Sequence, residues 1–124
     1  IMNYEVTFED GYANVKVEVE VYNSGMTTKE AVGFINAEAT ACKMELVEMY
    51  TDDWGESTEE IIYIRFFNAD KTKTACVTVN NEDENYYFWE ELAKKGATIE
   101  GFAISTEGEA WDKVLKVEKL KVTN

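Results

Sequence analysis

The sequence contains no histidine, and this absence removes several kinds of chemistry. A serine or cysteine nucleophile activated by a histidine base, a zinc ion held by imidazole and a histidine pH switch all need that side chain. Glycine-rich phosphate loops, G-x-S-x-G turns and S-x-x-K pairs are also missing from the sequence. We therefore expect no catalytic residue, no cofactor and no metal ion, and we favour a function in binding.

Proline is absent as well, and no stretch approaches the roughly 18 consecutive apolar residues of a transmembrane helix. No proline-rich or glycine/serine-rich linker divides the chain, so we expect one acidic domain over residues 1–124. The residues after Met2 lack the basic start and apolar run of a signal peptide, and Asn-x-Ser/Thr sequons are absent. These features predict a cytoplasmic protein in which Ile1, which precedes Met2, derives from an expression vector.

Cysteine is scarce, since the chain has only Cys42 and Cys76. Their wide separation is unlike a C-x-x-C motif, and two thiols without histidine cannot complete a four-ligand zinc site within one chain. We therefore expect two reduced, buried thiols, with Cys42 on the inner face of the first helix and Cys76 in a strand. A disulfide between them is the alternative.

Positive charge is also in short supply, because 12 Lys and Arg residues stand against 25 Asp and Glu residues, for a formal net charge of −13. Direct binding to nucleic-acid phosphates or to an anionic membrane is thereby disfavoured, and a basic protein partner is favoured. Hydrophobic residues make up 45% of the chain and aromatic residues 13%, enough to build a core. The sequence therefore predicts a folded acidic domain.

Alternation of apolar and polar residues predicts two strands near the beginning of the chain. Residues 4–9 and 15–21 have the two-residue period of strands that bury one face. The turn-forming residues at 10–14 predict that these strands pair as an antiparallel hairpin. The core side of the second strand would carry Val15, Val17, Val19 and Val21.

A capping box predicts where the first helix begins. Thr27 is followed three residues later by Glu30, and the two side chains can each bond to the backbone of the other residue. Apolar residues at helical spacing then form one stripe, interrupted by a single acid. The stripe contains Ala31, Phe34, Ile35 and Cys42, with Glu38 as its polar member.

The middle of the chain is rich in β-branched and aromatic residues, which predict a meander. Residues 61–67 have the character of a central strand, and the polar residues 52–57 before them form a turn. Residues 43–51 could extend the first helix, but we favour a strand that pairs with 61–67 across this turn. A further turn at 68–73 leads to a third strand at 74–79.

A second helix and two closing strands complete the predicted fold. Residues 86–95 place Phe88, Trp89, Leu92 and Ala93 on one helical face, with Asp83 as candidate N-cap and Gly96 at the end. Residues 98–105 and 111–122 alternate as strands. The order ββα-βββ-αββ predicts an α+β fold: an antiparallel or mixed sheet of about seven strands with two covering helices.

Acidic residues gather in the centre of the chain. Seven occur between positions 44 and 61 with no base among them: Glu45, Glu48, Asp52, Asp53, Glu56, Glu59 and Glu60. They could be a solvated strand edge that resists aggregation, or paired carboxylates for a metal or a glycosidase, although the D-x-D-x-D-G order of a calcium loop is absent. On a hairpin, carboxylates repeating every ~7 Å along one face can imitate a phosphate backbone. Trp54 is a typical interface anchor among them.

A second acidic cluster, Glu82, Asp83 and Glu84, precedes the second helix, with Glu90 and Glu91 further along. It could simply stabilise the positive end of the helix dipole, or it could extend the binding surface. The last strand contains four lysines, which could protect an exposed edge or pair with an acidic neighbour. These lysines are Lys113, Lys116, Lys119 and Lys121.

Together these features predict a small cytoplasmic inhibitor that occupies the basic nucleic-acid groove of a nuclease or another nucleic-acid enzyme. In size, charge and lack of catalytic motifs the chain is similar to anti-CRISPR, antirestriction and toxin-immunity proteins, without a residue motif of any of them. The predicted partner-binding residues are Asp52, Asp53, Trp54, Glu56, Glu59, Glu60, Glu82, Asp83 and Glu84. The alternative is a non-catalytic phage or surface module that self-associates through a sheet edge, and an enzyme is the third choice.

Overall fold

The computed structural model describes residues 3–8, 13–22, 24–50, 54 and 58–123, and the elements are defined within these ranges. Strands and helices follow one another in the predicted order. The elements are β1 (Asn3–Thr7), β2 (Asn14–Val19), α1 (Thr28–Ala37), β3 (Ala41–Tyr50), β4 (Thr58–Phe67), β5 (Thr74–Val79), α2 (Tyr86–Lys94), β6 (Thr98–Ile104) and β7 (Lys113–Thr123). Neither helix has the length and apolar character needed to cross a membrane, as far as the described residues go.

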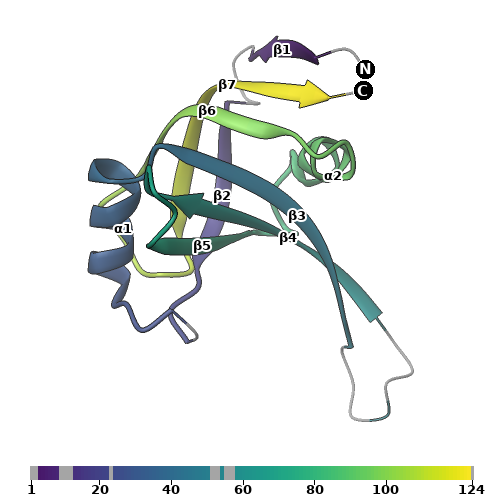
Figure 1. Cartoon of the computed structure of the whole chain (residues 1–124). Helices are drawn as coiled ribbons and strands as arrows, with labels where there is room; N and C mark the ends of the chain where they lie inside the picture. The colour runs from purple at the N-terminus through teal and green to yellow at the C-terminus, as the bar shows by residue number, and fades with distance from the viewer. Residues whose placement is uncertain (1–2, 9–12, 23, 51–53, 55–57, 124) are drawn as a thin grey trace.

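The strands form a closed antiparallel barrel rather than the plain sheet that we expected. Its order is β7-β2-β5-β4-β3-β6, and β6 pairs back onto β7, while β1 is an additional strand beside β7. The helices α1 and α2 lie on opposite sides of this barrel (Figure 1). The α+β class is thus confirmed, but the prediction missed that the last strand pairs on both sides and closes the sheet on itself, which satisfies edges that a plain sheet leaves open.

The predicted hairpin of the first two strands is wrong. Both β1 and β2 pair antiparallel with β7, so they run in the same direction along one of its edges. Val6 lies opposite Leu120 in this register, and Val15 lies opposite Leu115. The alternation of residues fixes which face of a strand is buried, but it does not select the strand that supplies the hydrogen bonds.

One hydrophobic core fills the barrel and extends to both helices. From β2 it takes Val15, Val17 and Val19, as predicted, whereas Val21 is only half-buried. The two helices each contribute one apolar face, with Phe34 and Trp89 as their largest fully buried side chains. Core burial thus holds α1 and α2 against the barrel, because each helix removes large apolar surfaces from water.

The first helix begins at the predicted capping box. The backbone N–H of Glu30 donates to Thr27 Oγ1 at 3.1 Å, and the backbone N–H of Thr27 donates to Glu30 Oε1 at 3.2 Å. The helix ends at Ala37, however, so Cys42 lies in β3 and not on the helix. The favoured strand at 43–51 is confirmed as β3, which pairs with β4 over its whole length.

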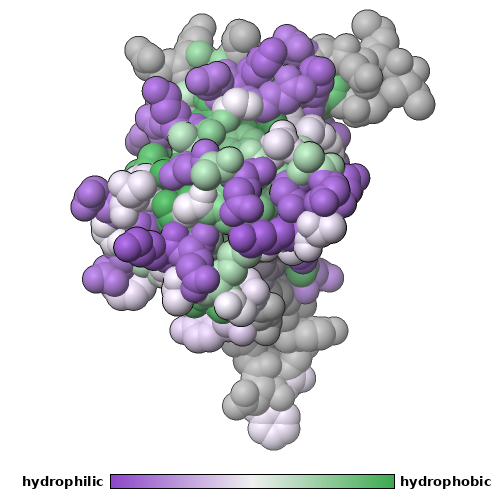
Figure 2. Space-filling model, turned by 60° about the vertical axis from the view of Figure 1, so that its left-hand side comes forward, coloured by the Kyte–Doolittle hydropathy of each residue, from purple (hydrophilic) through white to green (hydrophobic). Residues whose placement is uncertain are grey.

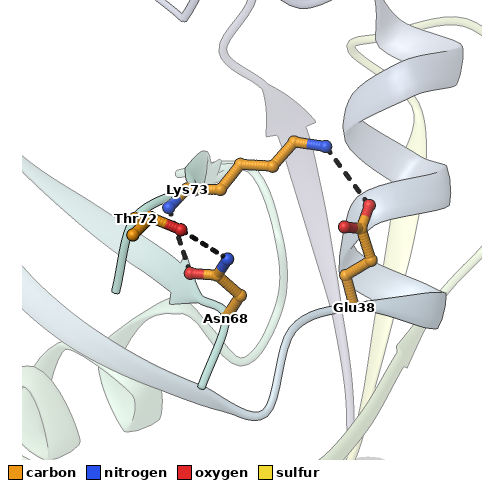
Figure 3. Close-up of polar contacts among 4 residues, drawn as sticks. All are labelled: Glu38, Asn68, Thr72 and Lys73. Atoms are coloured by element: carbon orange, nitrogen blue, oxygen red, sulfur yellow. Dashed lines mark hydrogen bonds and ion pairs between the residues drawn. The ribbon is translucent and has the colours of Figure 1, made fainter. Parts of the chain in front are cut away.

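The predicted turn at 68–73 is confirmed, and it holds the end of α1 (Figure 3). Asn68 Nδ2 donates to Thr72 Oγ1 at 3.0 Å, and Asn68 Oδ1 accepts the backbone N–H of Lys73 at 3.0 Å. The Lys73 ammonium then reaches Glu38 Oε2 of the helix end at 3.2 Å and lies 5.2 Å from the ring centre of Phe34. The β4–β5 turn and α1 are therefore joined by polar and cation–π contacts.

The lysines of the last strand do not protect an exposed edge, because β7 has paired neighbours on both sides. Lys121 pairs with Glu100 of β6 at 3.0 Å, and Lys119 lies 3.6 Å from Glu100 and 3.8 Å from Glu5 of β1. Lys119 and Lys121 therefore pair with acidic residues of neighbouring strands, which was the second of the two predicted roles. Lys113 differs from both, since it is 2% exposed.

The two thiols are free, and they differ in burial. Cys42 is buried as predicted and donates to the carbonyl oxygen of Ile99 at 3.8 Å. Cys76 lies in a strand as predicted, but it is only half-buried, because it occupies an outward position between the buried Ala75 and Val77 of β5. Desolvation raises the pKa of both thiols, and that of Cys76 reaches about 12.

These raised pKa values predict slow thiol labelling of the native protein, because the thiolate is the reactive form. At pH 8 we expect both cysteines to react far more slowly than in the unfolded chain, and Cys42 more slowly than Cys76. Stopped-flow labelling with a chromogenic disulfide, repeated on Cys76→Ser to isolate Cys42, measures the two rates. Labelling of Cys42 in the native protein at the unfolded rate would contradict its buried position.

Candidate protein-binding surface

The far ends of β3 and β4 form a two-stranded arm that extends beyond the body of the barrel (Figure 1). β4 pairs with β5 only from Tyr63 onward, and β3 pairs with β6 only at Cys42 and Lys43. We call residues 46–50 and 58–62 the β3–β4 arm, since within the described part of the chain these segments pair only with each other. The arm therefore leaves the outer edges of both its strands without a β partner in the described structure.

Part of the first predicted cluster lies on this arm. Glu59 and Glu60 are exposed at the beginning of β4, and Trp54 is 85% exposed. Asp52, Asp53 and Glu56 lie outside the described residues. In the β3–β4 register Glu48 is directly opposite Glu60. Like charges in this relation repel and destabilise the strand pair, so this acidic pair weakens the arm that carries it.

The second predicted cluster lies in the turns before α2. Glu82 and Glu84 are exposed, whereas Asp83 is half-buried. Asp83 Oδ2 accepts the backbone N–H of Lys16 at 3.0 Å, and its Oδ1 accepts that of Asn85 at 2.8 Å. The N-cap of α2 is Asn85, so the predicted N-cap role of Asp83 is wrong. The helix begins later than a cap at Asp83 requires, and the carboxylate ties this segment to β2 instead.

Because both carboxylate oxygens of Asp83 accept backbone N–H groups, Asp83→Ala is expected to lower the free energy of unfolding by about 1–2 kcal/mol. Glu82→Ala and Glu84→Ala, which remove exposed neighbours, are expected to change it by less than about 0.5 kcal/mol. Urea unfolding of the three variants measures the difference. If Asp83→Ala is as stable as the two controls, these hydrogen bonds contribute nothing to stability.

The fold brings the two clusters together, although more than 20 positions separate them in the sequence. Asn81 Nδ2 donates to Glu59 Oε1 at 3.0 Å, and the Tyr86 hydroxyl donates to the carbonyl oxygen of Glu60 at 2.8 Å. A shallow hollow of about 130 Å³ lies at this junction. The described residues that line it include Glu18, Glu59 and Glu60 but no lysine or arginine. This hollow at the base of the arm therefore carries three carboxylates and no cation among its described lining residues.

Sequence analysis missed Glu18, which β2 contributes to this hollow. Glu18 occupies an outward position in the alternating valine strand, so the pattern did contain the signal that it faces solvent. We use the term acidic surface for the exposed carboxylates at and beside the junction: Glu18, Glu48, Glu59, Glu60, Glu82 and Glu84. The pKa of Tyr86 is raised, first by desolvation and then by the negative charges of Glu90, Glu59 and Glu60, of which the last two belong to the acidic surface.

Repulsion within so acidic a protein predicts that moderate salt stabilises the fold. We expect the melting temperature to rise as NaCl increases from ~20 to ~200 mM, because the Debye length falls to about 10 Å at 0.1 M. Glu60→Gln should raise the melting temperature at low salt and reduce its salt dependence, since it removes the like-charge pair with Glu48. Glu107→Gln is the matched control. A melting temperature that falls with added NaCl would mean that attractive ion pairs dominate.

Catalysis could use a bound metal ion or an activated nucleophile. Within the described residues, no three Cys, Asp or Glu side chains are arranged to hold a metal ion. A second hollow of about 360 Å³ is lined in part by Glu20, Tyr63, Arg65 and Cys76. Arg65 Nε is committed to Glu45 Oε2 at 3.1 Å, and the raised pKa keeps the Cys76 thiol protonated at neutral pH. This arrangement does not activate Cys76 as a nucleophile.

Comparison with protein-family models, curated proteins and solved structures finds no match for this chain. No relative therefore assigns a role to any residue of the acidic surface. The arrangement of the described residues is itself informative, because the segments that carry the two acidic clusters meet at the base of an extended arm, and Trp54, which lies between the two strands of this arm in the sequence, is exposed.

Proposed function

We propose that the protein is an inhibitor that binds the basic nucleic-acid groove of a nuclease or another nucleic-acid-processing enzyme. The observation that carries this proposal is the convergence of the two acidic clusters at the base of the β3–β4 arm, joined by the Asn81–Glu59 hydrogen bond. Charge of one sign, concentrated on a rigid scaffold and exposed to water, suits recognition of a lysine- and arginine-rich surface.

The arm supplies the shape that a groove requires. Two paired strands are about 5 Å apart, and successive side chains of a strand point to opposite faces. Glu60 and Glu48 therefore share one face of the arm, and Glu59 lies on the other, so both faces carry negative charge. The acidic surface would meet the basic side chains of the groove and speed association, and Trp54 would fill an apolar pocket and slow dissociation. Inhibition then follows from occupancy, because nucleic acid and inhibitor compete for one surface.

Self-association is the second candidate function, and the open edges of the arm favour it. A strand edge without a β partner offers unpaired backbone donors and acceptors to another chain. Repulsion between acidic arms opposes pairing of two identical copies, however, since each copy brings Glu48 and Glu60. Sedimentation velocity in low and high salt distinguishes the two: an inhibitor stays monomeric without its partner, whereas an assembly module self-associates as salt screens the charge.

Affinity capture with competition tests the inhibitor proposal. The immobilised protein should retain a basic nucleic-acid-binding protein from host extract, and a DNA duplex or a structured RNA should release it in a concentration-dependent manner. The double variant Glu59→Gln/Glu60→Gln should retain much less, whereas Glu107→Gln/Glu109→Gln, with the same loss of charge in the β6–β7 connection, should bind as the parent does. Retention that nucleic acid cannot displace, or equal loss in both double variants, would refute a groove-directed mechanism.

A further inference from the structure

A larger pocket lies on the other side of the barrel, against α1. Its volume is about 790 Å³, within the range of small-molecule sites in proteins. One wall is α1, and the other is the connection from β6 to β7 together with the first residue of β7. We call it the α1 pocket; the lining residues used below are Lys29, Gly33 and Ala37 of the helix, and Ala110, Trp111 and Lys113 opposite.

The helix wall of the α1 pocket is kept open by small side chains. A Cβ atom added at Gly33 would meet nothing within 4 Å, so the space above this residue is empty of protein atoms. Glycine inside a helix is destabilising relative to alanine, and no contact in the fold requires glycine at this position. Ala37 and Ala110 also line the pocket, and Trp111, 59% exposed, supplies a large apolar ring. The walls therefore suit an apolar ligand body.

A buried lysine is among the residues that line this pocket. Lys113 is 2% exposed, and its Nζ donates to the carbonyl oxygens of Glu107 at 2.9 Å and Thr106 at 3.2 Å. An ammonium has three protons to donate, and no carboxylate of the described residues forms an ion pair with this one. A buried charge without a counter-charge is costly, so the site favours an anion. Lys29 adds a second positive charge to the lining.

We propose that the α1 pocket binds a small organic carboxylate with an apolar body, such as a medium-chain acyl or an aryl carboxylate. Lys113 Nζ donates a hydrogen bond to the carboxylate in place of, or in addition to, those to the loop carbonyls, and the apolar body lies along Gly33, Ala37 and Trp111. This proposal is independent of the inhibitory function, because the acidic surface adjoins α2 on the opposite side of the barrel (Figure 1). Figure 2, which turns the α1 side forward, shows hydrophobic and near-neutral atoms interspersed with hydrophilic ones across the middle of this face.

The negative charge of the whole protein opposes the binding of a carboxylate. A net charge of −13 repels anions in general, so a carboxylate that merely adsorbs to the protein is disfavoured. Saturable binding of an anion therefore needs local positive charge, and the α1 pocket provides two cations, Lys113 and Lys29, against one acid, Glu109. A neutral ligand of equal apolar size separates this contribution from hydrophobic burial.

Titration of the folded protein with octanoate and with 1-octanol, followed by ¹H–¹⁵N NMR, tests the proposal. We expect saturable 1:1 shifts for octanoate at residues of α1 and at 105–113, and affinity for 1-octanol at least about tenfold lower, or about 1.4 kcal/mol weaker. Gly33→Leu, which fills the empty space, should weaken both ligands by at least about tenfold. Glu91→Leu adds a leucine to an exposed position of α2 and should change neither.

Lys113→Met should reduce octanoate affinity to that of 1-octanol, and Lys29→Gln, which leaves the loop contacts of Lys113 in place, should reduce it severalfold. If Lys113→Met fails to fold, Lys29→Gln and Gly33→Leu still decide the outcome. The proposal is overturned if octanoate gives no saturable shifts, if the shifts lie outside α1 and 105–113, if 1-octanol binds equally well, or if Gly33→Leu retains the parent affinity.

Discussion

Trp89→Ala is expected to lower the free energy of unfolding by about 3–5 kcal/mol, the range for removal of a fully buried aromatic side chain. Trp89 is 0% exposed and anchors α2 in the core. Its indole is stacked on Phe8 with ring centres 5.6 Å apart, and Phe88 meets it edge-on at 5.8 Å. Loss of this ring would leave a large cavity where the segment after β1 meets α2. Domains of this size have total stabilities of about 5–15 kcal/mol, so the substitution should remove a large fraction of the stability.

A milder substitution separates the loss of packing from the removal of the indole N–H. The indole Nε1 of Trp89 has no acceptor among the described residues. Trp89→Phe removes this unsatisfied N–H together with part of the ring, so it should cost less than about half as much as Trp89→Ala. Tyr87→Ala, on the exposed side of the same helix, is the control and should cost less than about 0.5 kcal/mol. Denaturant unfolding measures all three, and equal losses for Trp89→Ala and Tyr87→Ala would refute the anchoring role.

Trp54→Ala is expected to weaken partner binding by about 2 kcal/mol or more, which corresponds to dissociation about 30-fold faster. Because Trp54 is 85% exposed, the substitution should leave the melting temperature nearly unchanged. The acidic residues should instead affect the rate of association. Glu59→Gln/Glu60→Gln should slow association by about tenfold at low salt and flatten its dependence on ionic strength, since exposed charges mainly steer the encounter.

Surface plasmon resonance against the captured partner, at two or more salt concentrations, separates these effects. Glu107→Gln/Glu109→Gln serves again as the control, because it changes the net charge equally at another place on the molecule. The binding mechanism fails if both charge variants slow association to the same extent, since net charge alone would then explain the effect. It also fails if Trp54→Ala leaves both rate constants unchanged.

Much of the local structure was predictable, because local patterns have local causes. The capping box at Thr27 and Glu30 placed the start of α1 correctly, and the runs at 61–67 and 74–79 became adjacent strands of the barrel. The end of α1 was not predictable in the same way. Cys42 continues the helical spacing of the apolar stripe, but the backbone N–H of Thr40 donates to the carbonyl oxygen of Phe67, and the chain is already aligned beside β4.

What the sequence could not provide is the choice of distant partners. Nothing near Val15 indicates that its strand pairs with residues about 100 positions away rather than with its neighbour, because the hydrogen bonds of a strand carry no side-chain identity. Proximity of the two acidic clusters depends on the same long-range pairing. Lys113 was misjudged for a different reason. In the two-residue alternation of β7 it lies on the same face as the buried Leu115 and Val117, which predicts an inward side chain, but lysine side chains are usually exposed to solvent.

Closure of the barrel by β7 also has a consequence for how the chain reaches its folded state. Residues 113–123 pair with β1, β2 and β6, and they join β2 directly to β6, which are otherwise linked only through β5, β4 and β3, so no earlier segment can complete the barrel. Contacts of such large sequence separation have a high loop-closure entropy and give slow folding, on the order of milliseconds to seconds. During synthesis, an emerging chain that lacks β7 would expose two long strand edges. We therefore expect refolding to be limited by docking of this final strand, and aggregation to compete with folding until it has docked.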